Sequence, residues 1–438
     1  MKRTITLLGT LLTLLAGGMA TEIVPAPEVL SLRGKPWRFR PTRPQSTCAT
    51  NPQTCPLVPA DATVEFLGRF TVDNPDYATP ALNWAYGGNG LGMGADGASL
   101  YMGAHDNDSK RLGRIPIPGT LAMTTLGTIV TQSQAPTFIA NPYLAGDIDP
   151  GEENNIIYGG TLIDPDDSNR LIVSRFSYYD GASNAEKSHY VCTAAIGSCT
   201  GPYVIDQPGW TAGYMTVIPP AWRTLLGGKA FTGLNGVAVV ARTSNGPSVT
   251  VFNPSDVGVE SPIPSTRLLG YPEDHATLGD YDANPAGTGQ WSQAHVMHGV
   301  GIVPNTRTLL FIGRTGTPAN ICYGTGVDYQ PPGSGECYDP ASVAGGVTGG
   351  AHAYPYAYEL YLYDLNDLVA VKNGTKNYWE PVPYAEITLD AQAGTNIVYK
   401  VHAAWTSSTF DPATNRVYVT ASTTSGNPTV HVWQLPTY

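Results

Sequence analysis

The chain is poor in charged residues. Only 13% of its 438 residues are Asp, Glu, Lys or Arg, which is about half the share found in an ordinary soluble domain. A disordered chain would be rich in charge and poor in aromatic residues, whereas this one has 25 Tyr, 9 Phe and 8 Trp. Disorder is therefore excluded as a description of the whole chain.

Long stretches free of helix-breaking residues are also missing. The chain contains 49 Gly and 37 Pro, and both residue types favour turns over continuous helix. A coiled coil or a helical bundle needs long runs of Ala, Glu, Lys and Leu without such breakers. The remaining fold class is a large all-β globular protein.

Several enzyme signatures are absent. The nucleophile elbow, the Walker loop, the dinucleotide fingerprint and the His-Glu-x-x-His zinc motif do not occur, which removes the enzyme classes that depend on them. Basic residues are scarce as well, with 24 Lys and Arg against 35 Asp and Glu and a formal net charge of −11. This acidic balance argues against general nucleic-acid binding.

The first 20 residues have the order typical of a secretory signal peptide. Lys2 and Arg3 precede an apolar run over residues 5–15, and small residues follow up to Ala20. The run is too short to span a bilayer, and no second apolar stretch approaches 18 residues. We predict a mature protein that begins near Thr21, is secreted or periplasmic, and has no membrane span.

The six cysteines fall into three local pairs. In an exported chain such even, clustered spacing indicates disulfides in short loops and not metal ligands. Each disulfide would stabilise the fold by about 2 to 3 kcal/mol. The predicted pairs are Cys48 with Cys55, Cys192 with Cys199, and Cys322 with Cys337.

One strand pattern recurs along the chain. It consists of an apolar triplet, a small residue and usually a basic residue, and we call it the marker. Each copy lies in the second strand of a set of four strands separated by polar turns. The copies occupy residues 101–105, 171–175, 238–242, 310–314 and 418–422.

Five markers predict a five-bladed β-propeller. The last set of strands lacks a fourth member, and an unassigned strand over residues 64–70 precedes the first set. A propeller fastened between its termini uses such an N-terminal strand to complete its last blade. We therefore predict a single propeller domain over residues 63–438, preceded by a Pro-rich extended lead-in over residues 21–62.

Two alternatives to five blades stay open. Residues 207–235 and 315–356 are long enough to hide further hairpins, which would give six or seven blades. A β-sandwich is the third choice, because it does not naturally produce five copies of one strand pattern with a split last unit.

Three stretches of the sequence carry a resemblance to known proteins: residues 218–222, residues 246–254, and residues 352–374. Through them the chain resembles a set of secreted bacterial β-propeller proteins, over roughly residues 210–420. The resemblance implies a propeller fold and export, and it implies no activity.

A looser comparison is with five-bladed glycosidases of the arabinanase and fructosidase kind. These enzymes place a carboxylate near the start of the first blade and another in a middle blade. The corresponding first strand here, residues 87–92, has no carboxylate. The comparison therefore does not support their chemistry.

The marker strands should end on one face of the propeller, around the mouth of its central channel. There they would gather a partial ring of basic side chains. Because the planar guanidinium group suits carboxylate, sulfate or phosphate, the ring predicts an anion-binding funnel for acidic sugars. The alternative is that each Arg pairs with a carboxylate of a neighbouring blade. The ring consists of His105, Arg175, Arg242 and Arg314, with Ser422 in the fifth place.

Histidines form a second candidate group. His295 and His298 are three residues apart, so in a strand only one of them can face the channel. Alignment on the markers matches His298 with Asn89, Gly159 and Thr406, which are small or polar as a channel lining would be. We therefore select His298, with His402 as its neighbour. His352 lies in the Gly-rich segment near the third cysteine pair and could reach the same mouth.

Such histidines permit two kinds of chemistry. Neutral imidazoles could bind a transition ion such as zinc. Alternatively, His298 or His402 could take a proton that Tyr158 or Tyr214 returns, as in β-elimination from an acidic polysaccharide. The remaining interpretation is that each histidine is a structural hydrogen-bonding residue.

An acidic segment over residues 147–153 resembles part of a calcium loop, with oxygen-bearing residues at alternate positions. It lacks the full twelve-residue ligand pattern. The two interpretations are a calcium site and a simple acidic turn.

Three functions follow from these features. The first is an extracellular lyase or hydrolase acting on acidic carbohydrate. The second is a non-catalytic module that binds a glycan or a protein, which the Tyr-rich composition also suits. The third is a structural extracellular protein. We expect a monomer in each case.

Overall fold

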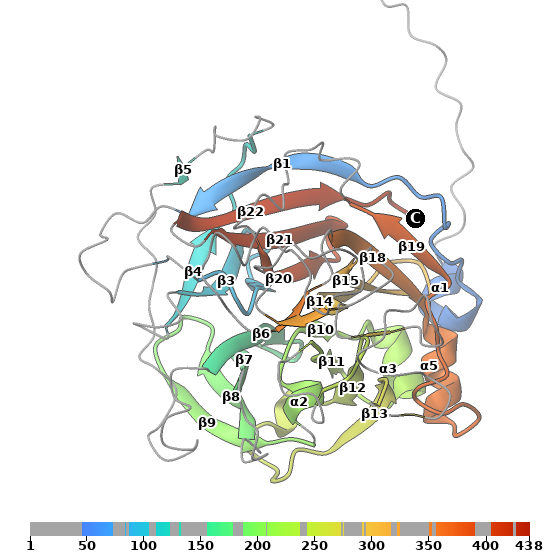
Figure 1. The fold of residues 1–438 in the computed structure, drawn as a ribbon. Helices are drawn as coiled ribbons and strands as arrows, with labels where there is room; N and C mark the ends of the chain where they lie inside the picture. Colours follow the sequence, from blue (N-terminus) through green and yellow to red (C-terminus); the bar gives the residue numbers. More distant parts are fainter. Residues whose placement is uncertain are drawn as a thin grey trace, which may run out of the picture. The chain divides into compact units, whose positions relative to one another are not determined.

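Figure 1 shows the computed structural model of the chain. It describes residues 46–72, 84, 87–104, 111–122, 131–132, 156–177, 187–206, 208–236, 243–272, 275, 291–292, 295–316, 322–324, 350–352, 356–389, 404–423 and 426–438. Residues 45–438 form one compact unit. The predicted signal peptide and residues 21–45 of the predicted lead-in lie outside the described residues.

Five antiparallel sheets form the blades of the ring (Figure 1). The first blade contains β2 (Gly92–Met93), β3 (Ser99–Gly103) and β4 (Leu112–Pro116). The second contains β6 (Ile156–Asp164), β7 (Asp167–Ser177), β8 (Lys187–Thr193) and β9 (Cys199–Val204). The third contains β10 (Met215–Val217), β11 (Ala230–Thr232), β12 (Val249–Phe252) and β13 (Ser265–Leu269).

The fourth blade contains β14 (Val296–Ile302), β15 (Thr308–Gly316), β18 (Tyr356–Asp364) and β19 (Ala385–Thr388). The fifth contains β20 (Ala404–Asp411), β21 (Arg416–Thr423), β22 (Gly426–Gln434) and β1 (Glu65–Val72), with the short β5 (Thr131–Gln132) beside β1. The innermost strands contact one another in the order β2, β6, β10, β14, β20 and back to β2. The prediction of five blades is confirmed.

The N-terminal strand closes the ring. β1 pairs antiparallel with β22, with Phe66 opposite Trp433 and Phe70 opposite Val430. The fifth blade therefore combines the N-terminal strand β1 with the three C-terminal strands β20, β21 and β22, and β1 lies outside these three. This is the closure that the unassigned strand at residues 64–70 predicted.

The two long stretches that left room for extra blades contain other elements. Residues 207–235 hold β10 and β11 with two short helices, α2 (Pro208–Thr211) and α3 (Pro220–Leu226). The connection from β15 to β18 holds a hairpin of β16 (Cys322–Gly324) and β17 (Gly350–His352), which is a separate two-stranded sheet. The described residues of these two stretches form no further blade.

One marker assignment is wrong. In the third blade the second strand is β11, which pairs with β10 and β12 and lies earlier in the chain than the predicted copy at residues 238–242. That copy, including Arg242, lies outside the described residues. Residues 238–240 are Ala-Val-Val and fit the apolar triplet, whereas β11 is Ala-Phe-Thr and ends on a polar residue.

The marker has an apolar triplet because both faces of each blade pack against neighbouring blades. In β15, Leu309 and Phe311 belong to the core shared with the third blade, whereas Leu310 and Ile312 belong to the core shared with the fifth. Successive strand residues point to opposite faces. A strand that is packed between two neighbouring blades therefore has consecutive apolar residues, without the usual alternation of apolar and polar side chains.

Glycine lets the innermost strands approach closely. A methyl group on Gly299 in β14 would lie 2.5 Å from the carbonyl oxygen of Ser408 in β20, and one on Gly301 would lie 2.6 Å from Cβ of Phe410. Both distances are below van der Waals contact. Any larger residue at these two positions would push the fourth and fifth blades apart.

Two of the three predicted disulfides are present. Cys48 is bonded to Cys55, and Cys192 is bonded to Cys199, which joins β8 to β9. Cys322 lies on β16, and its predicted partner Cys337 lies outside the described residues. Among the helices that the structure describes, none is long and apolar enough to cross a bilayer.

Three histidines are buried in the blades. Burial lowers the pKa of His189 to about 3 and that of His295 to about 4. Burial, together with the nearby positive charge of Arg69, lowers the pKa of His431 to about 3. All three therefore stay neutral in the folded protein down to acidic pH.

Truncation of a buried side chain in the closing strand should destabilise the protein. Phe70 is fully buried in the core between the fifth and first blades. Phe70→Ala is expected to lower the free energy of unfolding by about 3 to 5 kcal/mol, because it leaves a cavity. Glu65→Ala at the exposed start of β1 is the control and should change it by less than about 0.5 kcal/mol. Equal effects in urea unfolding would contradict closure through β1.

The buried histidines should make the protein sensitive to acid. In the unfolded chain a histidine takes up a proton near pH 6.5, whereas His189 in the folded state does not until about pH 3. The folded state is thus most favoured above pH 6.5 and loses stability as the pH falls toward 3. At pH 5 this loss is about 2 kcal/mol for each histidine.

The variant His189→Gln tests this expectation. Its loss of unfolding free energy between pH 7.5 and pH 5 should be about 2 kcal/mol smaller than that of the wild type. Phe70→Ala removes no titrating group and should keep the wild-type pH dependence. If urea unfolding shows the same pH dependence in His189→Gln, the neutral burial of His189 is wrong.

Candidate functional site

The ring has two mouths. Within each blade the first strand runs down to a turn and the second runs back, so the second-to-third-strand connections lie at one end and the first-to-second-strand turns at the other. We call the first end the upper mouth and the second the basal mouth. The predicted funnel belongs to the upper mouth.

At the upper mouth, Arg175 is buried. Its side chain is 1% exposed, and its guanidinium carbon lies 4.5 Å from the ring centroid of Tyr158, which is itself 3% exposed. The two residues face each other across β6 and β7. Arg175 therefore packs a cation against an aromatic ring within its own blade, a contact that leaves it little surface for a ligand.

Arg314 has a different environment. It lies in β15 opposite Val296 and Tyr358 and is half-buried. His105 and Arg242 lie outside the described residues, and Ser422 lies on β21 opposite Ala404. Of the predicted ring, the structure therefore describes Arg175 and Arg314 on separate blades and the backbone of Ser422. The anion funnel stays a prediction.

His298 occupies a β-bulge. The pairing of β14 with β15 shifts between Met297 and Gly299, and the corresponding shifts in the second and fifth blades fall at Gly159 and Thr406. The alignment of His298 with these two residues in the sequence agrees with this pairing. His298 is half-buried at this position.

His295 is held by its neighbours. Its Nδ1 lies 3.1 Å from the backbone nitrogen of Ser292, which donates to it, and its Nε2 lies 2.8 Å from Oγ1 of Thr315. The ring of Trp291 meets the imidazole edge-on, with centroids 5.0 Å apart. These contacts make His295 a packed core residue.

Tyr214 is a buried structural residue in the third blade. Its hydroxyl donates to the carbonyl oxygen of Ser248 at 3.1 Å and accepts from the backbone nitrogen of the same residue at 3.1 Å. Burial raises the pKa of this hydroxyl above its usual value. His352, the remaining candidate, lies on β17 opposite Cys322.

Neither predicted metal has a described site. Within the described ranges, no group of three or more His, Cys, Asp or Glu is arranged to hold a metal ion. The acidic segment predicted for calcium, residues 147–153, lies outside those ranges, as do His105 and His402.

The basal mouth opens into a cavity of about 670 Å³. We call it the basal cavity. Every blade contributes the end of its innermost strand or the turn that follows, and the N-terminal segment contributes the rest. Its lining comprises Cys48, Ala49, Cys55, Met93, Gly94, residues 161–163, 215–217, 219–222 and 302–306, Thr409, Phe410 and Pro412.

A short segment before the first blade forms one side of the basal cavity. Residues 46–58, which we call the basal strap, contain α1 (Ser46–Thr50) and the 3₁₀ turn η1 (Pro52–Thr54). Cys48 and Cys55 close this segment with a disulfide, and both line the cavity. The predicted lead-in is therefore folded over its last part.

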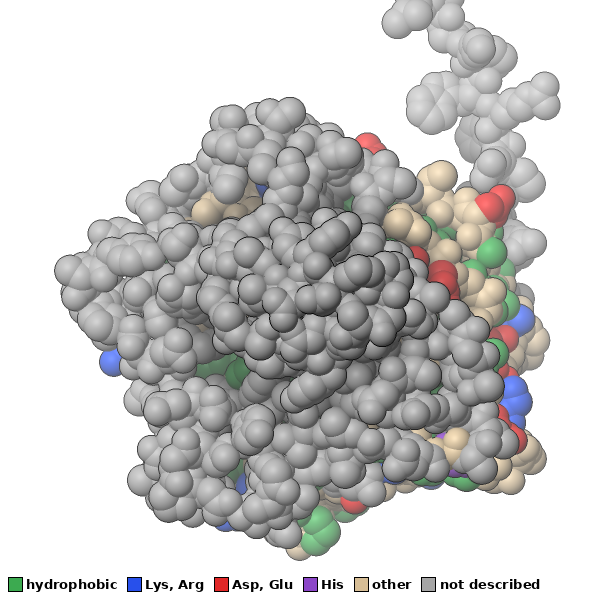
Figure 2. Space-filling view, viewed as in Figure 1, with side chains coloured by type: hydrophobic (Ala, Val, Ile, Leu, Met, Phe, Trp, Pro, Cys, Tyr) green, Lys and Arg blue, Asp and Glu red, His purple; other side chains and the backbone are tan. Residues whose placement is uncertain are grey.

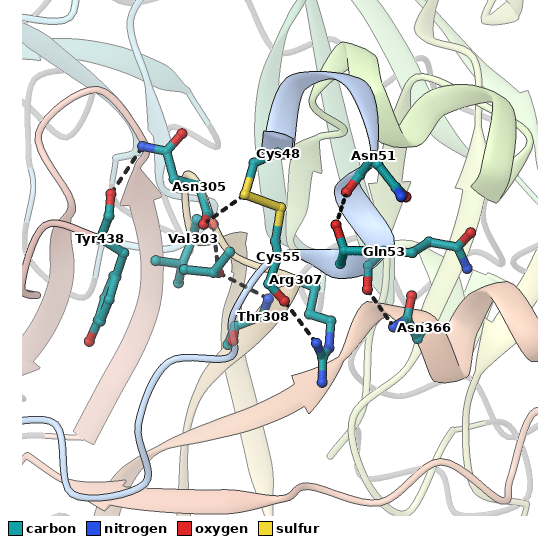
Figure 3. The surroundings of a disulfide bond; sticks show 12 residues. Cys48, Asn51, Gln53, Cys55, Val303, Asn305, Arg307, Thr308, Asn366 and Tyr438 are labelled. Carbon is teal, nitrogen blue, oxygen red and sulfur yellow. Dashed lines mark hydrogen bonds between the residues drawn. A yellow bond between two sulfur atoms is a disulfide. The ribbon is translucent and has the colours of Figure 1, made fainter. Parts of the chain in front are cut away.

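The basal strap is bound to the fourth blade. Arg307 donates through Nη1 to the carbonyl oxygen of Cys55 at 2.8 Å, and Asn366 donates through Nδ2 to that of Gln53 at 3.1 Å (Figure 3). Sγ of Cys48 lies 3.4 Å from the carbonyl oxygen of Asn305. Contacts at three points hold the strap against the mouth.

The end of the strap enters the core. The backbone nitrogen of Val58 donates to Oγ1 of Thr308 at 2.9 Å, and its carbonyl oxygen accepts from the hydroxyl of Tyr384 at 3.0 Å. Val58 itself is buried with the apolar residues between the fourth and fifth blades. The strap is thus continuous with the packing of the propeller.

No charged side chain lines the basal cavity among the described residues. Charged residues at the neighbouring turns are paired with one another: Nζ of Lys229 lies 2.5 Å from Asp166, and Nε of Arg307 lies 2.9 Å from Asp364. The hydrogen bond from Lys229 lowers the pKa of Asp166. Figure 2 likewise shows described side chains of both signs interspersed along one edge of the molecule.

The basal cavity was not among the sites predicted from the sequence, although the sequence contains a signal for it. In each blade an apolar residue lies within a few positions of the turn after the innermost strand. Because these positions recur as the marker does, they could have been recognised as a second ring at the opposite end. The residues are Met93, Ile163, Val217, Ile302 and Phe410.

Comparisons with known proteins assign the chain to no family. No protein-family model matches the chain, and no curated protein matches it. Among solved structures it is similar to the β-propeller domain of Cps50 (Swd1) from Myceliophteria thermophila, with 8% identity and a TM-score of 0.28, over 85% of this chain and 100% of that one. At this TM-score the likeness carries no argument about fold or function.

Proposed function

We propose that the protein is an exported binding module that holds a small molecule in the basal cavity. The observation that carries this proposal is the cavity itself, about 670 Å³ in volume and walled by all five blades and the basal strap. Ligand sites are typically concave, largely apolar and about 300 to 1,000 Å³ in volume. The basal cavity has each of these properties.

The lining favours binding over catalysis. General acid-base chemistry needs a titratable side chain within hydrogen-bonding reach of the reacting group. The described lining has no Asp, Glu, His, Lys or Arg, and its two cysteines are joined in a disulfide. A molecule in this cavity meets apolar side chains, threonines, one asparagine and the backbone.

The rim is built to be rigid. Four prolines line it, from the turns of the third, fourth and fifth blades, and the disulfide of the basal strap restrains the remaining side. Proline fixes one backbone angle, and a binding site that is already ordered loses less entropy when a ligand enters. The prolines are Pro219, Pro220, Pro304 and Pro412.

Export is part of the proposal. The charged and apolar pattern of residues 1–20 supports it, and so do the two disulfides, since disulfides persist mainly in oxidising compartments. A binding protein outside the cytoplasm would meet its ligand in the medium or the periplasm.

Action on acidic carbohydrate at the upper mouth is the alternative. It depends on His105, Arg242 and His402, which lie outside the described residues, and on His298 and the two arginines on the second and fourth blades. The stacking of Arg175 on Tyr158 favours a structural role for that residue. The basal cavity is therefore the better supported site.

Filling the basal cavity should abolish binding. Ala49 is exposed on α1 and lines the cavity, so Ala49→Trp introduces bulk there without disturbing the core. Two dyes would be titrated against the mature protein, neutral Nile red and anionic anilinonaphthalene sulfonate. We expect whichever dye binds the wild type to bind Ala49→Trp at least tenfold more weakly.

Ala60→Trp is the matched control, because Ala60 is an exposed alanine near the same end of the chain that does not line the cavity. It should bind the dyes as the wild type does, and both variants should keep the wild-type melting temperature. Equal dye binding by the two variants, or no binding of either dye to the wild type, would count against the proposal.

A further inference from the structure

The chemistry of the basal cavity defines the class of molecule that it suits. We propose that its ligand is uncharged, mainly apolar, and carries a hydroxyl or carbonyl group. This inference rests on the proposed function, since it concerns the same cavity. It follows from three properties of the described lining: its charge, its apolar anchors and its free hydroxyl groups.

The absence of charge disfavours ionic ligands. A carboxylate or ammonium group that leaves water for an apolar site needs an opposite charge and further hydrogen bonds to offset its loss of hydration. The described lining offers no opposite charge. A neutral molecule of the same size avoids this penalty.

Charged groups near the rim are already engaged. Asp166 accepts from Lys229, Arg307 donates to Asp364, and the guanidinium of Arg114 lies 2.5 Å from Asp96. An ionic ligand at the mouth would have to compete with one of these pairs. The rim therefore reinforces the preference for neutral molecules.

Large apolar side chains contribute to the walls of the cavity. Met93, Met215 and Phe410 extend from three innermost strands, and Trp222 comes from α3. Methionine side chains are flexible and polarisable, so they adapt to ligands of irregular shape. Because Met215, Phe410 and Trp222 are buried in the core, the apolar surface removed from water on binding would be mainly that of the ligand.

Threonines divide into two groups. The hydroxyl of Thr161 donates to the carbonyl oxygen of Gly90, and that of Thr306 donates to the carbonyl oxygen of Val303. In the described part of the chain, the hydroxyls of Thr216 and Thr409 make no hydrogen bond. Each can both donate and accept, so they suit a ligand hydroxyl or carbonyl.

These two threonines line the cavity from different blades. Thr216 is in β10 and Thr409 is in β20, and both strands contact β14. A polar group of the ligand bound to either hydroxyl would leave the rest of the molecule against the apolar walls. This arrangement gives an amphipathic ligand a defined orientation.

A series of matched competitors tests the charge preference. 1-Octanol, octanoate and octylammonium have the same chain length and differ in the charge of one end. Each would compete with the bound dye on the mature wild-type protein at pH 7.5 and on Ala60→Trp. We expect 1-octanol to compete at least tenfold more strongly than either ion.

Isosteric variants test the hydroxyl groups. Thr216→Val and Thr409→Val keep the shape of the side chain and remove one hydroxyl each, and the double variant should weaken 1-octanol competition about threefold to tenfold. Thr224→Val is the control, since Thr224 is exposed on α3 and does not line the cavity. If the threonine variants bind the dye as tightly as the wild type, their cavity is intact.

The outcomes separate the two proposals. If octanoate or octylammonium competes as well as 1-octanol, the ligand class is wrong while binding at the cavity stands. If the threonine variants bind 1-octanol as the wild type does, the hydroxyl contact is wrong. If Ala49→Trp retains full dye binding, the cavity is not the site and the proposed function fails with the inference.

Discussion

The pairing of β1 with β22 is the interaction on which the rest of the structure depends. Blades of a propeller have apolar faces on both sides, and a ring with a gap would expose two of them to water. The strand that closes the gap carries Phe70 and Val72 into the core between the fifth and first blades. Closure thus buries the last unprotected faces and couples the two ends of the chain.

Closure also places the basal strap. The chain must reach β1 from the side of the fourth and fifth blades, and on the way Val58 and Val64 enter the core between those blades. The segment just before them then lies across the basal mouth, where Arg307 and Asn366 hold it. One constraint therefore fastens the ring and supplies a wall of the cavity.

Much of the fold could be predicted from the sequence, because it rests on local patterns that repeat. The apolar triplet was correct in four blades, and the unassigned strand was correctly given to the fifth. The predicted marker was wrong in the third blade. There β11 has only three residues, and the triplet at residues 238–240 is richer in β-branched residues. Short strands are specified by their neighbours across the sheet more than by their own composition.

Less of the site could be predicted. The arginine markers were identified as a possible ligand ring, but the sequence carries no sign that Arg175 would be buried against Tyr158. That contact depends on a register shift in β6, which brings the two residues opposite each other. The apolar residues before each turn were visible in the sequence, yet their convergence requires the ring to be closed first.

The sequence by itself determined four of the five marker strands, the number of repeats, and the pairing of Cys48 with Cys55 and of Cys192 with Cys199, because each depends on residues close together in the chain. Only the tertiary structure decided that the two ends of the ring differ. One end carries Arg175 and Arg314, and the other holds a cavity without described charges. That cavity is made from residues between Cys48 and Pro412, and their distances are set by the closed ring and not by their spacing in the sequence.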